Sequence, residues 1–200
     1  MTIDAVQHRI LQEATRLFAA QGYDGTSIQQ IAEAAGITRP TLVYHFTSKE
    51  GLRQAVLDRL FAHWTAELPR LLTAAQKGPR PDALLNNLFG FFQEQPALAR
   101  LVLREALDRP EALRALLRQH LHPWTALLSQ AIVLGQGGGW LSADTDPEAF
   151  ITLMVASAVG LVAVGESAAA LVPGEPGLPA QQAELTRVAK RALLNPRRPG

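Results

Sequence analysis

The stretch that decides the fold is TSIQQIAEAAGITRPTLVYHFTSKE, which occupies residues 26–50. Ser27 and Gln30 have the spacing of a capping box, so they predict the start of a helix that Gly36 ends after about two turns. Thr38 then predicts the cap of a second short helix. Two short capped helices joined by a glycine turn are typical of a helix-turn-helix.

Longer helices flank this motif on both sides. Apolar residues from Ile3 to Phe18 recur at the helical period, and Gly22 can adopt the left-handed conformation that a helix end needs. On the other side, Ser48 predicts the cap of a long fourth helix with an apolar stripe. Pro69 removes one backbone hydrogen bond, so we expect it to kink or end that helix.

The composition excludes several kinds of site and does not predict a strongly basic surface. The chain has 200 residues, no cysteine and a formal net charge of +1. Disulfides, thiolate metal sites and a cysteine nucleophile are therefore excluded, and the composition suits a reducing cytoplasm. Up to Glu50 there are four lysines and arginines and five acids, so any contact with nucleic acid must come from local placement of charge.

The rest of the chain also has the pattern of helices. The apolar spacing, prolines and caps predict helices at about 82–94, 97–107, 110–134, 147–170 and 180–194. We expect Pro123 to kink the third of these, Asp146 to cap the fourth, and a glycine loop at 135–139 to separate the two. No stretch alternates as a strand, so the predicted fold class is all-α. A linker at 77–81 and a disordered tail at 196–200 are also expected.

The start of the second short helix carries side chains suited to DNA. Arg39 can donate two hydrogen bonds to guanine or bind a phosphate, and Thr41 can contact a thymine methyl or a phosphate. Lys49 adds its charge to the free backbone N–H groups at the start of the fourth helix, which favours a phosphate. The predicted DNA contacts are Thr26, Ser27, Thr38, Arg39, Thr41, Tyr44, His45 and Lys49. Structural roles are the alternative for two of them: His45 could be buried, and Tyr44 could pack on the first helix.

These residues resemble the tetracycline-repressor (TetR) family. The matching positions, from the end of the first helix to the start of the fourth, are Phe18, Gly22, 26–38, Leu42, His45, Phe46 and 48–52. The pattern covers about the first quarter of the chain. The resemblance implies a cytoplasmic homodimer with a DNA-binding domain of three helices and a helical C-terminal domain that binds a small ligand.

Two positions depart from the family's pattern. Members often have glycine where this chain has Pro40, and tyrosine where it has Val43. That tyrosine commonly contacts a phosphate, whereas the side chain of Val43 cannot donate a hydrogen bond. Tyr44 faces about 100° around the helix and need not replace it.

The segment 150–164 is apolar nearly all round a helix, which is typical of a helix buried on several sides. A membrane span is the rival interpretation, but the uninterrupted run is shorter than the roughly 20 residues that a span needs. We therefore expect no membrane contact and a helix packed between its own domain and a second copy of the chain. The helices at about 147–170 and 180–194 of two chains would form a four-helix bundle and make a homodimer.

An apolar ligand pocket in the C-terminal body is a further expectation. The candidate ligand-binding residues are Trp64, Phe89, Phe92, Glu105, His120, Trp124 and Met154. Aromatic residues at helical spacing are more often plain core, so packing is the alternative for them. Glu105 and His120 are polar groups on apolar stripes and need a partner, which could be a ligand, Arg109 or another side chain.

Together these features predict a DNA-binding transcriptional regulator: a homodimeric repressor that a small apolar ligand releases from a palindromic operator in double-stranded DNA. Residues 1–47 would form the DNA-binding domain and residues 48–195 the ligand-binding and dimerisation domain. No catalytic or metal-ligating constellation is evident, so we expect no enzyme activity and no cofactor. A small α-helical enzyme or carrier, and an architectural DNA binder without a ligand, are the alternatives.

Overall fold

The protein is described by a computed structural model that covers residues 3–76 and 81–194. Within these two ranges it contains ten α-helices and no strand, apart from an isolated bridge between Leu141 and Leu194. The all-α prediction is therefore confirmed. Residues 77–80 of the predicted linker lie outside the described ranges, and so does the tail predicted at 196–200.

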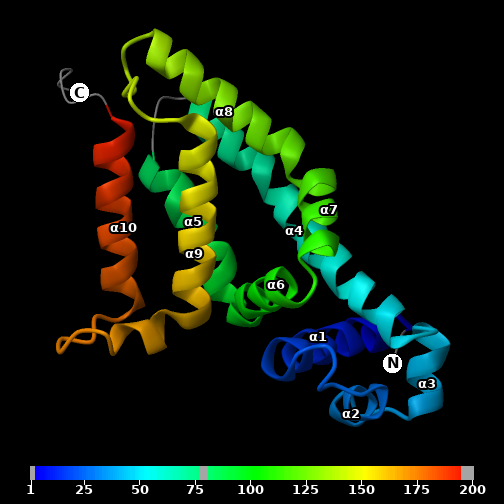
Figure 1. The fold of residues 1–200 in the computed structure, drawn as a ribbon. Coiled ribbons are helices and arrows are strands. Elements are labelled where there is room, and N and C mark those ends of the chain that lie inside the picture. Colours follow the sequence, from blue (N-terminus) through cyan, green and yellow to red (C-terminus); the bar gives the residue numbers. More distant parts are fainter. Residues whose placement is uncertain (1–2, 77–80, 195–200) are drawn as a thin grey trace.

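Four helices form the N-terminal part, namely α1 (Ile3–Gln21), α2 (Ile28–Ala34), α3 (Arg39–His45) and α4 (Lys49–Gln76). Gly22 follows α1 with φ of 77°, and Gly36 lies in the turn after α2 with φ of 63°, a conformation that side-chain-bearing residues rarely adopt. Figure 1 shows α1, α2 and α3 gathered at one end of α4, which runs from them into the rest of the molecule. The helix-turn-helix predicted from the sequence is thus present.

The long helix α4 does not end where the sequence predicted. It continues through Pro69 to Gln76 and has 28 residues. Proline removes one backbone hydrogen bond at its own position, but the bonds on either side remain. Of the two expected effects of Pro69, a kink or an end, the end is therefore wrong.

Six further helices make up the body: α5 (Pro81–Glu94), α6 (Pro96–Asp108), α7 (Pro110–His120), α8 (His122–Gly137), α9 (Pro147–Ala169) and α10 (Leu178–Leu193). Asp146 caps α9 as predicted, because its carboxylate accepts a hydrogen bond of 2.8 Å from the backbone N–H of Ala149. In Figure 1, α5, α9 and α10 lie on one side of the molecule, and α4, α7 and α8 lie on the other.

Two predictions about the body are corrected. The helix expected at 110–134, with a kink at Pro123, is two helices, α7 and α8, which meet at Leu121, and Pro123 stands in the first turn of α8, where its missing N–H costs no hydrogen bond. The loop expected at 135–139 starts later, since α8 continues to Gly137. At Gly135 the side chain of Leu141 folds back so closely that a Cβ would lie 2.7 Å from its Cδ1, which only glycine avoids.

The apolar helix α9 is the centre of the body. It packs against α5, α6, α8 and α10, and Met154, Ala158 and Val159 are among its buried residues. By length and composition alone α9 could cross a membrane, but its contacts with four other helices are those of a core helix. Part of it stays uncovered in the single chain, because Leu153 is 59% exposed and Val164 is 50% exposed.

Candidate nucleic-acid interface

The helix α2 is held at its start by a reciprocal pair of hydrogen bonds. The Ser27 hydroxyl accepts from the backbone N–H of Gln30 at 3.1 Å, and the Gln30 side-chain oxygen accepts from the backbone N–H of Ser27 at 2.7 Å. This is the predicted capping box. Ile31 and Ala32 on the opposite face are fully buried, so α2 is fixed against the neighbouring helices.

The helix α3 turns one face inward and leaves its other face in solvent. The Thr38 hydroxyl accepts from the backbone N–H of Thr41 at 3.3 Å and caps the helix, and the two threonine hydroxyls lie 2.8 Å apart. Leu42 is fully buried and anchors the helix. Arg39 and Tyr44 are exposed, so the surface of α3 that would face DNA is uncovered.

Tyr44 and His45 differ in their surroundings. The Tyr44 side chain is 78% exposed, so it does not pack on α1, and that alternative is wrong. His45 is half-buried, with its ring edge-on to Tyr44 at 5.4 Å between centroids. Val43, the position at which the family resemblance leads one to expect a tyrosine, is also exposed, so an apolar side chain occupies this place on the outer face of α3.

Thr26 does not reach the surface. Its side chain is 1% exposed, and its hydroxyl donates a hydrogen bond of 2.7 Å to the backbone carbonyl of Gly22. The hydroxyl therefore ties the end of α1 to the start of α2. The prediction that Thr26 contacts DNA is corrected on this ground, because its side chain has no access to a phosphate.

Lys49, the predicted phosphate contact, begins α4 beside the ring of Tyr23. Ser48 caps the helix by accepting from the backbone N–H of Gly51 at 3.0 Å. The Lys49 ammonium lies 4.1 Å from the centre of the Tyr23 ring, and the guanidinium of Arg109 lies 3.9 Å from the same ring. Tyr23 thus links Lys49 to the end of α6, a role that the sequence did not reveal.

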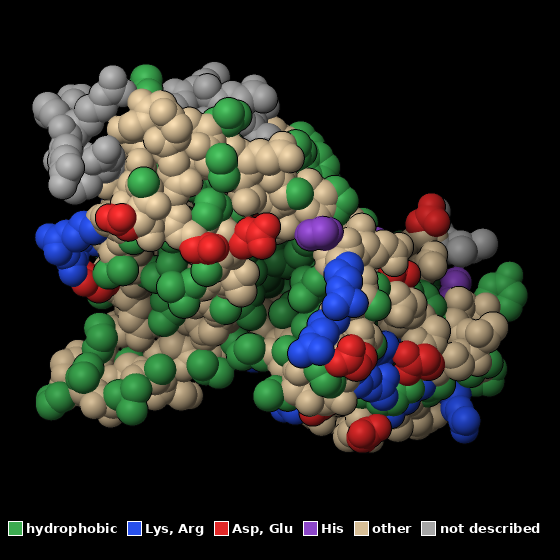
Figure 2. Space-filling model, turned by 45° about the horizontal axis from the view of Figure 1, so that its top comes forward, with side chains coloured by type: hydrophobic (Ala, Val, Ile, Leu, Met, Phe, Trp, Pro, Cys, Tyr) green, Lys and Arg blue, Asp and Glu red, His purple; other side chains and the backbone are tan. Residues whose placement is uncertain are grey.

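The charges at this end of the molecule are mixed. Figure 2 shows Lys and Arg side chains interspersed with Asp and Glu side chains over the part that α1, α2 and α3 form. Arg16 is already paired with Glu13 at 2.8 Å. If contact with nucleic acid depends on locally placed positive charge, as the sequence predicted, Arg39 and Lys49 are the main residues to supply it.

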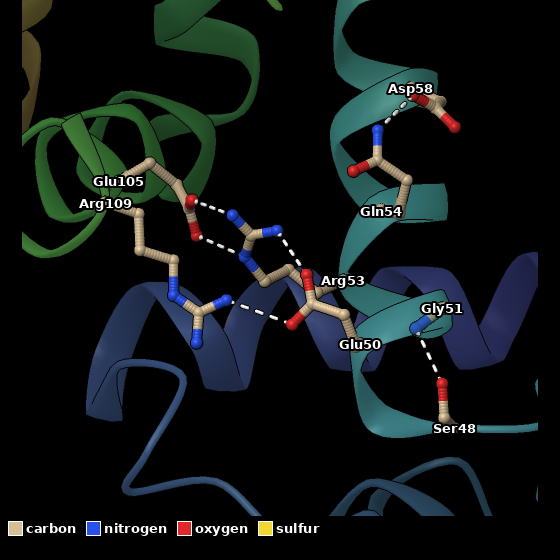
Figure 3. A network of polar contacts seen from close by, with 8 residues as sticks. All are labelled: Ser48, Glu50, Gly51, Arg53, Gln54, Asp58, Glu105 and Arg109. Atoms are coloured by element: carbon tan, nitrogen blue, oxygen red, sulfur yellow. Dashed lines mark hydrogen bonds and ion pairs between the residues drawn. The ribbon is translucent and has the colours of Figure 1, made fainter. Parts of the chain in front are cut away.

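A network of ion pairs joins the start of α4 to α6 (Figure 3). The guanidinium of Arg53 donates to both carboxylate oxygens of Glu105, at 3.1 Å and 2.6 Å, and to Glu50 at 2.8 Å. Arg109 donates to the other oxygen of Glu50 at 3.0 Å. Only 3% of the Arg53 side chain and 6% of the Glu105 side chain are exposed, so this is a buried bidentate pair. The partner that Glu105 needs is Arg53.

The periodicity of α4 offered a signal for Arg53. Arg53 lies on the same face of α4 as Val56, Leu57 and Leu60, all of which are buried. A position on this apolar face predicts that the cation of Arg53 is buried too. A buried cation needs a carboxylate, and Glu105 was the polar residue left over on an apolar stripe of α6.

The network also changes the acid–base behaviour of its outer members. Burial on its own would raise the pKa of Glu50, but the hydrogen bonds from Arg109 and Tyr23 and the charges of Arg53 and Arg109 outweigh it and lower that pKa below 4.5. Burial, followed by the nearby Glu50, raises the pKa of Tyr23 above 10.0. Glu50 is therefore charged and Tyr23 neutral at pH 7.

A second contact fastens α6 to α1. The Arg104 guanidinium donates hydrogen bonds of 2.9 Å to the backbone carbonyls of Ala19 and Ala20. These carbonyls belong to the last turn of α1, where no helical N–H follows to bond them. The body therefore holds both α1 and α4, which are the two helices that flank the helix-turn-helix.

Most of the predicted ligand residues lie in the core. Trp64, Phe89, Phe92 and Met154 are each at most 6% exposed, and Trp64 stacks edge-on with Phe92 at 5.4 Å between centroids. His120 is half-buried and stacks on Phe61 at 5.2 Å, and Trp124 packs at the edge of the same core. These contacts agree with plain packing, and a ligand role for these residues stays a prediction.

Two family models match this chain. One, described as bacterial regulatory proteins, tetR family, matches residues 10–56, and one described as tetracyclin repressor-like, C-terminal domain, matches residues 101–166. Together they cover more than half of the chain. The chain belongs to the TetR family. The helix-turn-helix of α2 and α3 is thus that of a bacterial regulatory protein of the TetR family, and the family resemblance inferred from the sequence is confirmed.

Individual relatives support the assignment to the TetR family. The HTH-type transcriptional repressor ComR of Escherichia coli K12 is 42% identical over 67 residues, which are 34% of this chain and 32% of ComR. The A-factor receptor protein of Streptomyces griseus is 26% identical over 192 residues, which are 94% of this chain and 63% of that protein. This chain therefore spans less than two thirds of the length of either relative.

A solved structure shows the same fold. A TetR transcriptional regulator from Chloroflexus aurantiacus superposes with a TM-score of 0.67 at 22% identity, over 96% of this chain and 98% of that chain. The order of the helices described above, with the helix-turn-helix at one end and the helical body at the other, is thus the TetR fold.

Proposed function

We propose that this protein is a transcriptional repressor that binds a palindromic operator in double-stranded DNA as a homodimer, in the cytoplasm. The observation that carries the proposal is the exposed outer face of α3, which presents Arg39 on a helix anchored by the buried Leu42. Membership of the TetR family supports a regulator over an enzyme or carrier. We propose residues 1–47 as the DNA-binding domain and residues 48–195 as the body.

The proposed DNA contacts are Ser27, Thr38, Arg39, Thr41, Tyr44, His45 and Lys49. Arg39 and Lys49 should make different kinds of contact. Arg39 stands at the start of α3 and would bind a base edge or a phosphate, whereas Lys49 stands at the start of the 28-residue helix α4 and would bind a phosphate. Tyr44 is exposed and offers a hydroxyl near the position where Val43 cannot donate.

The uncovered apolar residues of α9 and α10 support the dimer. Leu153 and Val164 on α9 and Val188 on α10 are each about half-exposed in the single chain. A second copy packed on these two helices would bury them in a four-helix bundle. Light scattering at micromolar concentration should give the mass of a dimer, and a monomer would contradict this part of the proposal.

The control of DNA binding by a small apolar effector is proposed by analogy. The relative from Streptomyces griseus is named as a receptor, and this chain has a large apolar core around α4, α5 and α9. An effector that favours a different spacing of the two recognition helices would shift the population off the operator. An architectural DNA binder would show neither an effector response nor a preferred palindrome.

The test starts with selection of bound DNA from a random pool, which should return a palindromic site. On that site, Arg39→Ala should weaken binding by about 1–3 kcal/mol and relax the preference at one base position, if Arg39 contacts a base. Lys49→Ala should weaken binding to all sequences alike and reduce the salt dependence by about one phosphate contact. Arg118→Ala, on the exposed side of α7, is the matched control and should change nothing. Unchanged binding by both variants would show that the assigned face is wrong.

A further inference from the structure

A cavity of about 520 Å³ lies between α1, α4 and the turn that joins α5 to α6. Its size is within the range of small-molecule sites, which is roughly 300–1,000 Å³. None of the ligand residues predicted from the sequence lines it. This cavity is therefore a different site from the ligand pocket that the sequence predicted around Trp64, Phe89 and Phe92.

The floor of the cavity is apolar. Val56 and Leu60 lie one helical turn apart on α4, and Leu98 faces them from the first turns of α6. All three are at most 6% exposed, so they form part of the continuous core and offer a firm apolar surface. The hydrocarbon part of a ligand could pack on this floor and cover the half-buried Leu11 and Ala97 beside it, which would remove their apolar surface from water.

The walls of the cavity are basic. His8 and Arg16 of α1 and Arg59 and His63 of α4 line it, against a single acid, Glu13. The carboxylate of Glu13 is already paired with Arg16 at 2.8 Å. The lining therefore supplies no free carboxylate for Arg59.

Arg59 and His8 meet across the cavity. Arg59 Nη2 lies 3.5 Å from His8 Nε2, and among the described residues no carboxylate lies within ion-pair distance of Arg59. A guanidinium can only donate, so the Nε2 of His8 accepts in this contact, and the charge of Arg59 creates a local positive potential. An anionic group placed between them would accept hydrogen bonds from the guanidinium in a planar fork, and from the Nε2 of His8 once the imidazole takes the tautomer that carries its proton there.

We propose that this cavity binds an amphipathic organic anion, with its carboxylate between Arg59 and His8 and its hydrocarbon part over Val56, Leu60 and Leu98. The site joins α1, next to the helix-turn-helix, to α4 and α6. A bound molecule would bridge these three helices, and its effect on DNA binding rests on the proposed function. The binding itself does not, so it is tested without DNA.

The experiment is isothermal titration calorimetry of the full chain with octanoate, with octan-1-ol and with inorganic phosphate. Octanoate should bind, and the other two should bind at least about tenfold more weakly, because one lacks the charge and the other lacks the hydrocarbon part. Arg59→Gln and His8→Gln should each weaken octanoate binding, Arg59→Gln by about tenfold. Both residues are exposed, so both variants should keep the helical circular dichroism and unfolding temperature of the wild type.

Arg118→Gln, a charge removed from the exposed side of α7, is the matched control and should bind octanoate as the wild type does. Three results would overturn the proposal. They are equal octanoate binding by the wild type and Arg59→Gln, binding of octan-1-ol or phosphate as tight as that of octanoate, and no heat of binding with octanoate up to about 1 mM.

Discussion

In the helix-turn-helix, side-chain hydrogen bonds cap the starts of α2 and α3. They join Ser27 to Gln30 and Thr38 to Thr41, and the residues of each pair are three positions apart. At the junction between α4 and α6, the bonds join Arg53 to Glu105, 52 positions apart. The first region is thus organised by caps within a single helical turn. The second is organised by the packing of helices that are distant in the chain.

The two regions also differ in what the loss of one bond would cost. The caps lie at the exposed ends of short helices, where water can replace a lost partner. The pair of Arg53 and Glu105 is buried, where a charge without its partner is strongly unfavourable. Loss of the buried ion pair between α4 and α6 should therefore lower the free energy of unfolding more than loss of a cap in the helix-turn-helix.

Breaking the buried pair should have the largest effect. Glu105→Ala leaves the buried guanidinium of Arg53 with only the exposed Glu50, so we expect the free energy of unfolding to fall by about 3–5 kcal/mol. Urea denaturation at pH 7 and fixed protein concentration measures this. The matched control is Glu111→Ala, whose ion pair with Arg114 is exposed and should contribute at most about 1 kcal/mol. Equal losses in the two variants would contradict the contrast between buried and exposed pairs.

Releasing α1 from α6 should have the next largest effect. Arg104→Gln removes two charge-assisted hydrogen bonds to the last turn of α1, which should lower the free energy of unfolding by about 1.5–3 kcal/mol. Hydrogen exchange should become faster at the end of α1 before it changes in the body. Arg118→Gln serves as the control. If exchange at the end of α1 were unchanged, the contact would be incidental.

Removing a local cap should cost less. Ser27→Ala removes the acceptor for the backbone N–H of Gln30, so we expect a loss of about 1 kcal/mol in unfolding free energy. Ser129→Ala, inside α8, makes the same chemical change away from a helix start and should not destabilise the protein. A loss for Ser27→Ala as large as that for Glu105→Ala would remove the distinction between the two regions.

The smallest expected effect is a dependence on pH at the edge of the junction. The lowered pKa of Glu50 means that its charged form stabilises the fold above pH 4.5, and this contribution is lost as the pH falls through the lowered value. The wild type should therefore be more stable than Glu50→Gln at pH 7, and the difference should shrink below pH 4.5. Unfolding by urea at pH 7 and at low pH measures it. A difference that stays constant would contradict the assigned role of Glu50.

Much of the fold was predictable from the sequence, because its signals are short-range. The capping box at Ser27, the turn at Gly36 and the cap at Asp146 were all confirmed. The errors concern prolines and glycines whose effect depends on context. Pro69 lies inside α4 and does not end it, and Gly135 lies inside α8, which continues to Gly137.

The candidate site was predictable in its position and less so in its details. Arg39 and Tyr44 are exposed on α3, where side chains that contact DNA would have to lie. Thr26 is a polar residue beside the motif, yet its hydroxyl is buried against Gly22. The sequence did not show that Tyr23 lies under both Lys49 and Arg109, because the three residues come from different parts of the chain.

The sequence by itself determined the helix-turn-helix, its caps and the all-α class, since hydrophobic period and capping depend on residues within one or two turns. The tertiary structure alone decided that Glu105 pairs with Arg53, that Arg104 holds the end of α1, and that His8 meets Arg59 in a basic cavity. The physical reason is that such pairs lie about fifty or more positions apart. Their meeting depends on how whole helices pack, and the side chains then satisfy the charges that packing brings together.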